Sequence, residues 1–349
     1  IKLLSGSNFY APTGTLTVTH AGAGGNYAVN IDTGGVFTHN SGTVTIEGPR
    51  DDTYTEMIWR TSNPLYNLNV WLTAPCNDLL ISSNEDATGL VIANDLNVIA
   101  TKDFMGPSSP ANSKPLTVSG TATISGTLGR LAEKSDWSFG SAGMYGTAAL
   151  DIKSGGTYVA TSGTTFIKGD FENAGTFTNN GGTVQFSDEG NINNSASVEP
   201  VFYNLIASGS YVYPRKDITV ENLLLCPTSS KGLRFLGTDV TLSMGDSDSS
   251  GGSIFNNGGR MRMANSAKIY GTVETDPTPC SGTDWEWDDK TYNLKNLDYN
   301  IDLETPADSC TIQLDGPCEF DAVTIGATDT LNISGQRAEF TGDLALESG

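Results

Sequence analysis

The residues best suited to chemistry form one short acidic and aromatic segment near the end of the chain. Positions 284 to 289 carry the sequence Asp-Trp-Glu-Trp-Asp-Asp. On a β-strand, Trp285 and Trp287 would share one face, while Asp284, Glu286 and Asp288 would share the other. Aromatic faces stack on sugar rings, and two carboxylates held about 5 to 9.5 Å apart hydrolyse a glycosidic bond.

Two interpretations of this segment follow. In the functional one, Trp285 and Trp287 bind a glycan, and the three acids are the catalytic groups of an alternative, polysaccharide-degrading activity. In the structural one, the tryptophans fill the interior beneath a loop and the acids stay solvated. We expect no catalysis here, and we keep Asp284, Glu286 and Asp288 as the residues that would carry it.

A serine-rich loop offers two candidate ligands for a metal ion. Asp246 and Asp248 lie in Met-Gly-Asp-Ser-Asp-Ser-Ser-Gly, and carboxylate oxygens suit Ca²⁺. The EF-hand pattern is not met, because no glutamate stands at position twelve together with the glycine at position six. A solvated loop without an ion is the competing interpretation. We expect no organic cofactor, and Ca²⁺ is the ion that the acidic chain suits.

Composition and charge narrow the classes of protein and partner. The net charge is −21, from 19 basic and 40 acidic residues. A negative field of this size repels nucleic acid and anionic membrane surfaces, so we expect neither as a partner, and no membrane insertion. Such a charge suits a protein in extracellular, salty surroundings, where screening acts within about 8 Å.

The same composition predicts an all-β chain. Glycine occurs 40 times, and threonine, serine, asparagine and aspartate separate short apolar runs. These residues favour turns and pleated strands over helices. The one weak helical candidate is Leu128–Asp136, about two turns long.

An internal repeat organises the chain. Residues 35–46 (Gly-Val-Phe-Thr-His-Asn-Ser-Gly-Thr-Val-Thr-Ile) return without a gap as residues 175–186 (Gly-Thr-Phe-Thr-Asn-Asn-Gly-Gly-Thr-Val-Gln-Phe). His39 thus aligns with Asn179, which predicts a turn or ladder residue rather than a catalytic base. We match Tyr27–Ile31, before the first copy, to residues 158–167, before the second.

Further matches extend the repeat toward the end of the chain. Tyr-Asn-Leu occurs at 66–68, 203–205 and 292–294, and a related strand follows each, with Leu96, Leu223 and Val323 in matching places. We therefore expect one elongated β-solenoid over residues 1–349, with diverged units at about 14–110, 150–235 and 270–345.

Short alternating runs such as Val44 and Ile46, or Val184 and Phe186, predict strands with one buried face. Asparagine and glycine between the runs fit either a hairpin of a β-sandwich or a corner between stacked rungs. The repetition favours stacked rungs, because a solenoid repeat contacts only its neighbours.

The strings GTFTNNGGTVQF, FYNL and ENLLL resemble repeats of phage tail-fibre and tailspike proteins and of large bacterial surface adhesins. The resemblance covers about residues 14–345. It implies a right-handed parallel β-helix with loop insertions, on a virion or cell surface outside the cell. It also implies structural or adhesive work, with the chain itself, a cell-surface glycan or other surface proteins as partners.

Open solenoid ends expose unpaired backbone groups, so we expect a homo-oligomer or fibre. Two apparent insertions, residues 103–114 and 136–147, are candidate contact loops. Their large side chains either pack on the solenoid or form a subunit interface, and they are Phe104, Met105, Trp137, Phe139, Met144 and Tyr145. Five scattered cysteines do not form a disulfide framework, and pairing among Cys280, Cys310 and Cys318 stays open.

Overall fold

The regular structure of the protein, in a computed structural model, consists of β-strands. The structure describes residues 1–19, 27–49, 55–73, 78–81, 89–100, 103–105, 114–131, 133–209, 211–225, 232–235, 240–244, 253–255, 260–263, 268–271, 284–287, 291–295, 303–304, 311–314, 318–320, 323–325, 330–333, 335, 337–340 and 344–346. Within these ranges no helix occurs, and the paired strands run parallel to one another. The predicted all-β, parallel solenoid is confirmed.

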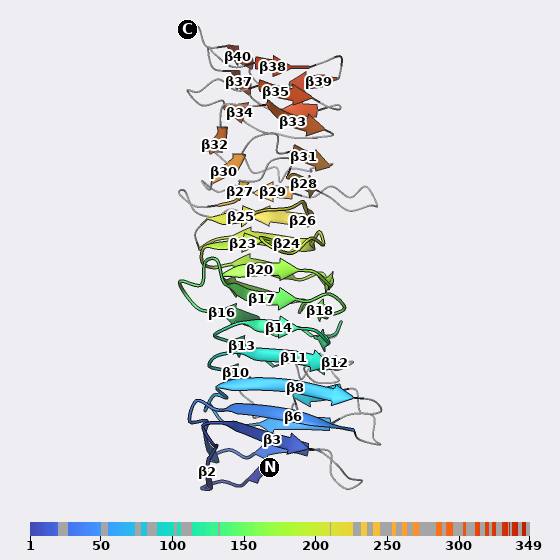
Figure 1. Ribbon diagram of the computed structural model, residues 1–349. Coiled ribbons are helices and arrows are strands. Elements are labelled where there is room, and N and C mark those ends of the chain that lie inside the picture. Colours follow the sequence, from blue (N-terminus) through green and yellow to red (C-terminus); the bar gives the residue numbers. More distant parts are fainter. Residues whose placement is uncertain are drawn as a thin grey trace. The chain divides into compact units, whose positions relative to one another are not determined.

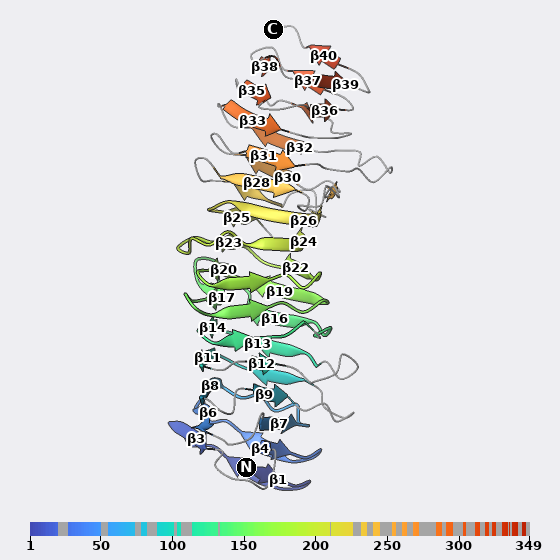
Figure 2. The same ribbon diagram turned by 90° about the vertical axis from the view of Figure 1, so that its right-hand side faces the viewer.

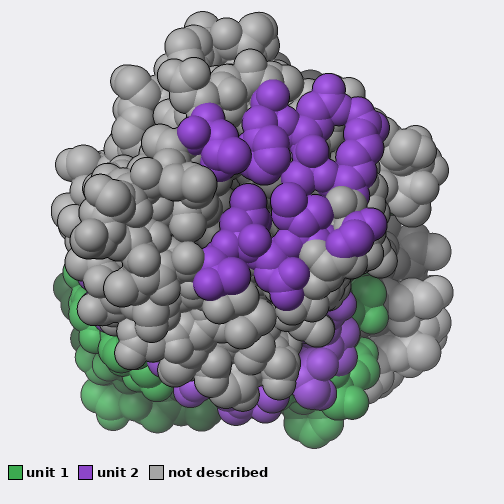
Figure 3. Space-filling model, turned by 90° about the horizontal axis from the view of Figure 1, so that it is seen from above, with its two compact units in different colours: residues 1–183 green, residues 184–349 purple. Residues whose placement is uncertain are grey.

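Contacts divide the chain into two compact units, residues 1–183 and 184–349, which Figure 3 colours separately. In the first unit the chain visits three faces in turn, and each face is a stack of parallel strands (Figures 1 and 2).

Face A consists, in stacking order, of β1 (Lys2–Leu3), β4 (Tyr27–Ile31), β7 (Thr55–Trp59), β9 (Asp78–Ile81), β12 (Asp103–Met105), β15 (Thr127–Leu128), β18 (Thr157–Val159) and β21 (Thr176–Thr178). Face B consists of β2 (Asn8–Tyr10), β5 (Val36–Thr38), β10 (Leu90–Ile92), β13 (Leu116–Val118), β16 (Trp137–Gly140) and β19 (Thr164–Lys168). Face C consists of β3 (Thr15–Thr19), β6 (Thr43–Pro49), β8 (Asn67–Thr73), β11 (Leu96–Ala100), β14 (Ala122–Ile124), β17 (Ala148–Ile152) and β20 (Asp170–Asn173).

Face B is continued between β5 and β10 by single contacts rather than by a full strand. The Phe37 N–H donates to Oδ1 of Asn63 at 3.4 Å, and Leu65 forms an isolated parallel bridge to Ile92. Every turn of the first unit therefore passes through faces A, B and C in that order.

The interior of the first unit is filled by the alternate residues of its strands. On face C the inward positions are fully or almost fully buried, and they include Ile46, Leu68, Val70, Leu96, Val98, Ile124 and Ile152. Each buried side chain of this size contributes about 1.5–3 kcal/mol relative to leaving it exposed. The two-residue period seen in the sequence is thus the period of burial.

Aromatic rings stack from rung to rung within this interior. Phe9 stacks on Phe37 with ring centroids 5.6 Å apart, and Phe37 meets Trp59 edge to face at 5.4 Å. Farther along the chain, Tyr158 stacks on Phe177 at 5.9 Å. Aromatic pairs of this geometry add about 0.5–1.5 kcal/mol to the burial of their area.

Tyr158 brings a hydroxyl into this interior. Its Oη lies 2.9 Å from Oγ1 of Thr165, so the buried phenol has a hydrogen-bond partner. Burial raises the pKa of Tyr158 well above its ordinary value, and the hydrogen bond to Thr165 lowers it by less. The phenolate is disfavoured because a charge in this apolar interior loses its hydration.

The turn between β5 and β6, which we call the first corner (residues 39–42), holds two residues in the left-handed region. Asn40 has φ 47° and Ser41 has φ 60°. The Ser41 N–H donates to Nδ1 of His39 at 2.8 Å, and Nδ2 of Asn40 donates to the carbonyl of Ala11, one rung earlier, at 2.8 Å. A Cβ on Gly42 would lie 2.0 Å from a backbone carbonyl oxygen.

The turn between β21 and β22 (Thr183–Phe186), which we call the second corner (residues 179–182), is built in the same way. Asn180 has φ 51° and Gly181 has φ 67°. The Gly181 N–H donates to Oδ1 of Asn179 at 3.1 Å, and Nδ2 of Asn180 donates to the carbonyl of Ala160 at 3.0 Å. The predicted equivalence of His39 and Asn179 as turn residues is confirmed.

The two corners nevertheless belong to different faces. β5 lies on face B, whereas its counterpart β21 lies on face A. The preceding rungs show the same shift, because β2 and β3 lie on faces B and C while β18 and β19 lie on faces A and B. The structure also changes one alignment. Tyr27–Ile31 is the single strand β4, and the true counterpart of residues 158–167 is β2, its turn and β3.

Two further predictions are corrected within the first unit. Leu128–Asp136 is not helical in its described residues, because Leu128 ends β15 and irregular chain follows. The proposed contact loop 136–147 is largely strand at its start: Trp137 and Phe139 belong to β16 and are 2% and 0% exposed. Phe104 and Met105 likewise belong to β12 rather than to a loop.

The second unit is again a set of parallel strands. Its long sheet runs, in order, through β22, β24 (Val201–Ala207), β26 (Ile218–Leu225), β28 (Thr241–Met244), β31 (Lys268–Gly271), β33 (Thr291–Lys295), β35 (Thr311–Leu314) and β38 (Thr330–Asn332), with β29 (Ser253–Phe255) also beside β26.

In the same unit β23 (Gly190–Ile192) pairs with β25 (Val212–Pro214). The separate short sheets are β27 (Arg234–Phe235) with β30 (Arg260–Met263) and β32 (Asp284–Trp287), β34 (Leu303–Glu304) with β37 (Val323–Ile325) and β40 (Leu344–Leu346), and β36 (Cys318–Phe320) with β39 (Ala338–Phe340). The later Tyr-Asn-Leu segments lie within β24 and β33.

Candidate functional site

The acidic and aromatic segment predicted from the sequence forms strand β32, which pairs with β30. In this register Arg260 lies opposite Asp284, and Arg262 lies opposite Glu286. The separation of the arginines and the acids in the sequence conceals this neighbourhood.

Other predicted site residues lie outside the described residues. They are Asp246 and Asp248 of the calcium loop, Asp288 at the end of the acidic segment, and Cys280 and Cys310. Within the described part of the chain, no group of three or more histidine, cysteine, aspartate or glutamate residues is arranged to hold a metal ion. Nor does any helix there have the length and apolar character needed to cross a membrane.

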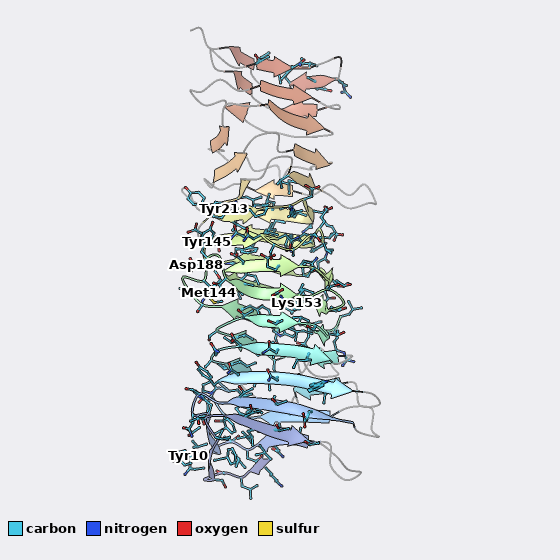
Figure 4. The ribbon with its side chains drawn as sticks, in the orientation of Figure 1. Tyr10, Met144, Tyr145, Lys153, Asp188 and Tyr213 are labelled. Carbon is cyan, nitrogen blue, oxygen red and sulfur yellow. The ribbon has the colours of Figure 1, made fainter. Side chains whose placement is uncertain are left out.

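Two labelled residues of the first unit mark the remaining contact loop (Figure 4). Tyr145 is exposed, and Met144 is half-buried, with its Sδ accepting a hydrogen bond from the Ser141 N–H at 3.2 Å. The loop is fixed to β20, because Oδ1 of Asp170 accepts from the Gly146 N–H at 3.2 Å. This part of the predicted contact surface is therefore accessible and anchored.

In the second unit, Tyr213 belongs to a polar cluster on β23 and β25 (Figure 4). Its hydroxyl donates to Oε1 of Glu189 at 2.9 Å, and the Arg215 guanidinium lies 5.4 Å from the centre of its ring. Nε of Arg215 donates to Oδ1 of Asn191 at 2.7 Å. Because Tyr213 is almost fully buried, this cluster braces two rungs rather than offering a binding surface.

Face C carries the most regular outer surface of the first unit. One row of alternate positions runs across seven strands in continuous register, and its members are Thr17, Thr45, Asn69, Asn97, Thr123, Asp151 and Glu172. Thr45 and Glu172 are covered, with 8% and 6% of their surface exposed, and the other five are at least partly exposed. Neighbours in such a row are about 4.8 Å apart. The strands that carry it lie one above another in Figure 1.

A second outward row lies two residues farther along the same strands, about 6.6 Å away. Thr19 of β3, Glu47 of β6 and Trp71 of β8 occupy successive positions in register. The Trp71 side chain is 49% exposed, in contrast to Trp59 and Trp137, which are almost completely buried.

A β-bulge completes this second row on β11. Pairing with β8 shifts between Val98, which faces Val70, and Ala100, which faces Trp71, so Ile99 is the extra residue. Ile99 is 42% exposed. Bulges re-aim side chains and occur near functional sites. Here the bulge leaves a second apolar side chain exposed on the strand next to Trp71.

Hydrogen bonds fix the polar side chains beside the indole. Nδ2 of Asn97 donates to Oδ1 of Asn69 at 3.0 Å, and Nδ2 of Asn69 donates to Oγ1 of Thr45 at 3.4 Å. In the second row, Oγ1 of Thr19 donates to Oε1 of Glu47 at 3.3 Å. Such ladders hold each side chain in one orientation before any ligand arrives.

We call this surface the Trp71 strip, and it comprises Thr19, Glu47, Asn69, Trp71, Asn97 and Ile99. It presents an exposed aromatic side chain beside preordered amides and a carboxylate. The sequence alone did not indicate this surface, because the paired tryptophans at 285 and 287 form the more conspicuous aromatic motif. The available signal was the outward Thr-x-Thr, Thr-x-Thr and Asn-x-Asn series on successive rungs, followed by Val-Ile at 98 and 99, where the alternation breaks.

In comparisons with known proteins, no family model, curated protein or solved structure matches the chain.

Proposed function

We propose that the chain is a structural and adhesive segment of an extracellular fibre, on a virion or a cell surface. The supporting observation is the long outward register of face C over a filled apolar interior. Each rung hydrogen-bonds to the next, so the stack carries load along its length while its faces remain available for contacts. The acidic net charge of −21 suits such a role outside the cell.

The proposal includes self-association into an oligomer or fibre and excludes catalysis. Light scattering coupled to size exclusion, together with electron microscopy of the same sample, tests the first part. We expect particles larger than one 36.8 kDa chain, with rod-like or fibrous outlines. A monodisperse monomer at all concentrations would contradict self-association.

The rival function, polysaccharide degradation at the 284–288 acids, has its own readout. Polysaccharides incubated with the protein would gain new reducing ends, and Asp284→Asn or Glu286→Gln would abolish that gain. We expect no such gain with the unmodified chain. Turnover that depends on either carboxylate would overturn the fibre assignment as a description of the principal activity.

A further inference from the structure

We infer that the Trp71 strip binds a neutral polysaccharide chain. This inference rests on the adhesive part of the proposed function, and it gives that function a location and a class of partner. The strip lies on face C of the first unit and is separate from the tryptophans of β32, which the sequence alone favoured.

The first argument is the exposure of Trp71. A large aromatic side chain on a flat sheet face loses about half of its possible burial, since 49% of its surface remains in solvent. Ile99, exposed to 42% through the bulge, enlarges the apolar area next to it. An indole face packs well against the C–H face of a pyranose ring, which is apolar and of similar size.

The second argument is the polar ladder alongside. Asn69 and Asn97 are linked by a hydrogen bond of 3.0 Å, which fixes the orientation of both amides. Each planar amide has two N–H donors and a carbonyl acceptor, more than the ladder uses at one time. Sugar hydroxyls both donate and accept, so they match this surface. The ladder repeats at about 4.8 Å, which is comparable to the length of one sugar unit.

Charge excludes two other classes of partner. Nucleic acid and acidic polymers are repelled by the net charge of −21, and Glu47 adds a carboxylate in register with Trp71. A purely apolar partner would bury the Glu47 carboxylate and those amide donors and acceptors that the ladder does not use, and it would offer them no hydrogen bonds, which is costly. An uncharged polymer with hydroxyl groups meets both the aromatic and the polar parts of the strip.

Native affinity electrophoresis tests the inference on the complete chain. Gels would contain a neutral polysaccharide, namely mixed-linkage β-glucan, galactomannan or arabinoxylan, or an acidic one, namely alginate or polygalacturonate. We expect retardation by at least one neutral polymer and by neither acidic one. Trp71→Ala should weaken that binding about tenfold or more, as loss of a central aromatic contact does.

Three variants serve as controls. Trp71→Phe keeps an aromatic ring and should retain most of the binding. Tyr10→Ala removes another exposed aromatic side chain, 69% exposed on face B, and should bind as the unmodified chain does. Asn69→Ala should weaken binding while leaving the indole in place. Equal thermal midpoints for Trp71→Ala and the unmodified chain show that folding is preserved.

Several results would overturn the inference. They are retardation by no neutral polymer, equal retardation of the Trp71→Ala variant, and retardation by acidic polymers alone. Conversion of an oligomer to a monomer by Trp71→Ala without saccharide binding would assign the strip to a second copy. Fibre formation is measured separately by electron microscopy. A fibre that binds no saccharide would contradict saccharide binding by the Trp71 strip and would leave the proposed structural function standing.

Discussion

The first and second corners reach one backbone geometry with different residues. The first has His-Asn-Ser-Gly and the second has Asn-Asn-Gly-Gly. A ring nitrogen accepts the turn hydrogen bond in one and an amide oxygen accepts it in the other. Where a neighbouring carbonyl blocks any Cβ, both copies have glycine. The difference teaches that steric exclusion limits this corner more tightly than the identity of its hydrogen-bonding groups.

The largest expected loss of stability comes from replacing the glycine that both corners require. Gly42→Ala would place a Cβ 2.0 Å from the Pro12 carbonyl oxygen, and Gly182→Ala would place one 2.0 Å from that of Thr161. Each change should lower the free energy of unfolding by about 3 kcal/mol or more, because the backbone must move. Urea denaturation measures it.

Gly14→Ala is the matched control, since nothing lies within 4 Å of its added Cβ. It should change stability by no more than about 0.5 kcal/mol. A loss below about 1 kcal/mol at either corner would show that the corner can relax, contrary to the comparison.

The next effect concerns the asparagine that bonds to the preceding rung. Asn40→Ala and Asn180→Ala each remove a hydrogen bond and place alanine at positive φ. Each should cost about 2 kcal/mol in the free energy of unfolding. Asn→Gly at the same positions keeps the backbone conformation and should cost less. Equal losses for alanine and glycine would assign the whole effect to the hydrogen bond.

The interiors beside the two corners differ in one ionisable group, so only the second should make the free energy of unfolding depend on pH. Tyr158 is the counterpart of Phe9, and its folded pKa is raised above the ordinary value of 10.0. The stability it contributes is complete below pH 10 and declines as the pH rises toward the folded pKa, because the unfolded chain loses the proton first.

Tyr158→Phe should cost about 1 kcal/mol at pH 7, through the lost hydrogen bond to Thr165. It should also flatten the decline of stability above pH 10. Urea midpoints between pH 7 and 11 provide the measurement, with the variant and the unmodified chain compared at each pH. If stability falls equally with pH in the variant and the unmodified chain above pH 10, the fold does not raise the pKa of Tyr158.

The smallest expected effect on the free energy of unfolding comes from exchanging the residues at the third position of the two corners, Ser41 and Gly181. Ser41 has φ 60°, where glycine is unstrained. Ser41→Gly should raise the free energy of unfolding by about 0.5–1 kcal/mol, and Gly181→Ser should lower it by a similar amount. Thermal unfolding of the pair decides the sign. The same sign for both changes would contradict a common backbone strain.

Much of the fold was predictable because burial follows the sequence period. Val184 and Phe186, two residues apart, are buried, and Gln185 between them is partly exposed. The corner at His39 and Asn179 was predictable from alignment alone. Local residue preferences allowed a helix at Leu128–Asp136. Pairing with the neighbouring rungs instead places Leu128 in β15.

The surface site was less predictable, because register brings its members together. Glu47 and Trp71 are 24 residues apart in the chain and face each other only once the rungs are stacked. The bulge at Ile99 is likewise a feature of the pairing, because it lies where the register between β11 and β8 shifts. For the same reason, Trp137 and Phe139 were mistaken for loop residues: nothing local distinguishes an inward strand from an insertion.

The displacement of the repeated corners by one face has a consequence for how such a chain tolerates change in length. An extra strand and corner would shift every later segment to the next face. The corners tolerate such a shift, because the first and second corners form the same hydrogen bonds although they follow strands on different faces. A surface spread over several rungs does not. The residues of the Trp71 strip stay on one face only when insertions or deletions between its strands add or remove complete turns of the solenoid. The strip therefore constrains the length of the chain between rungs, whereas a single corner does not.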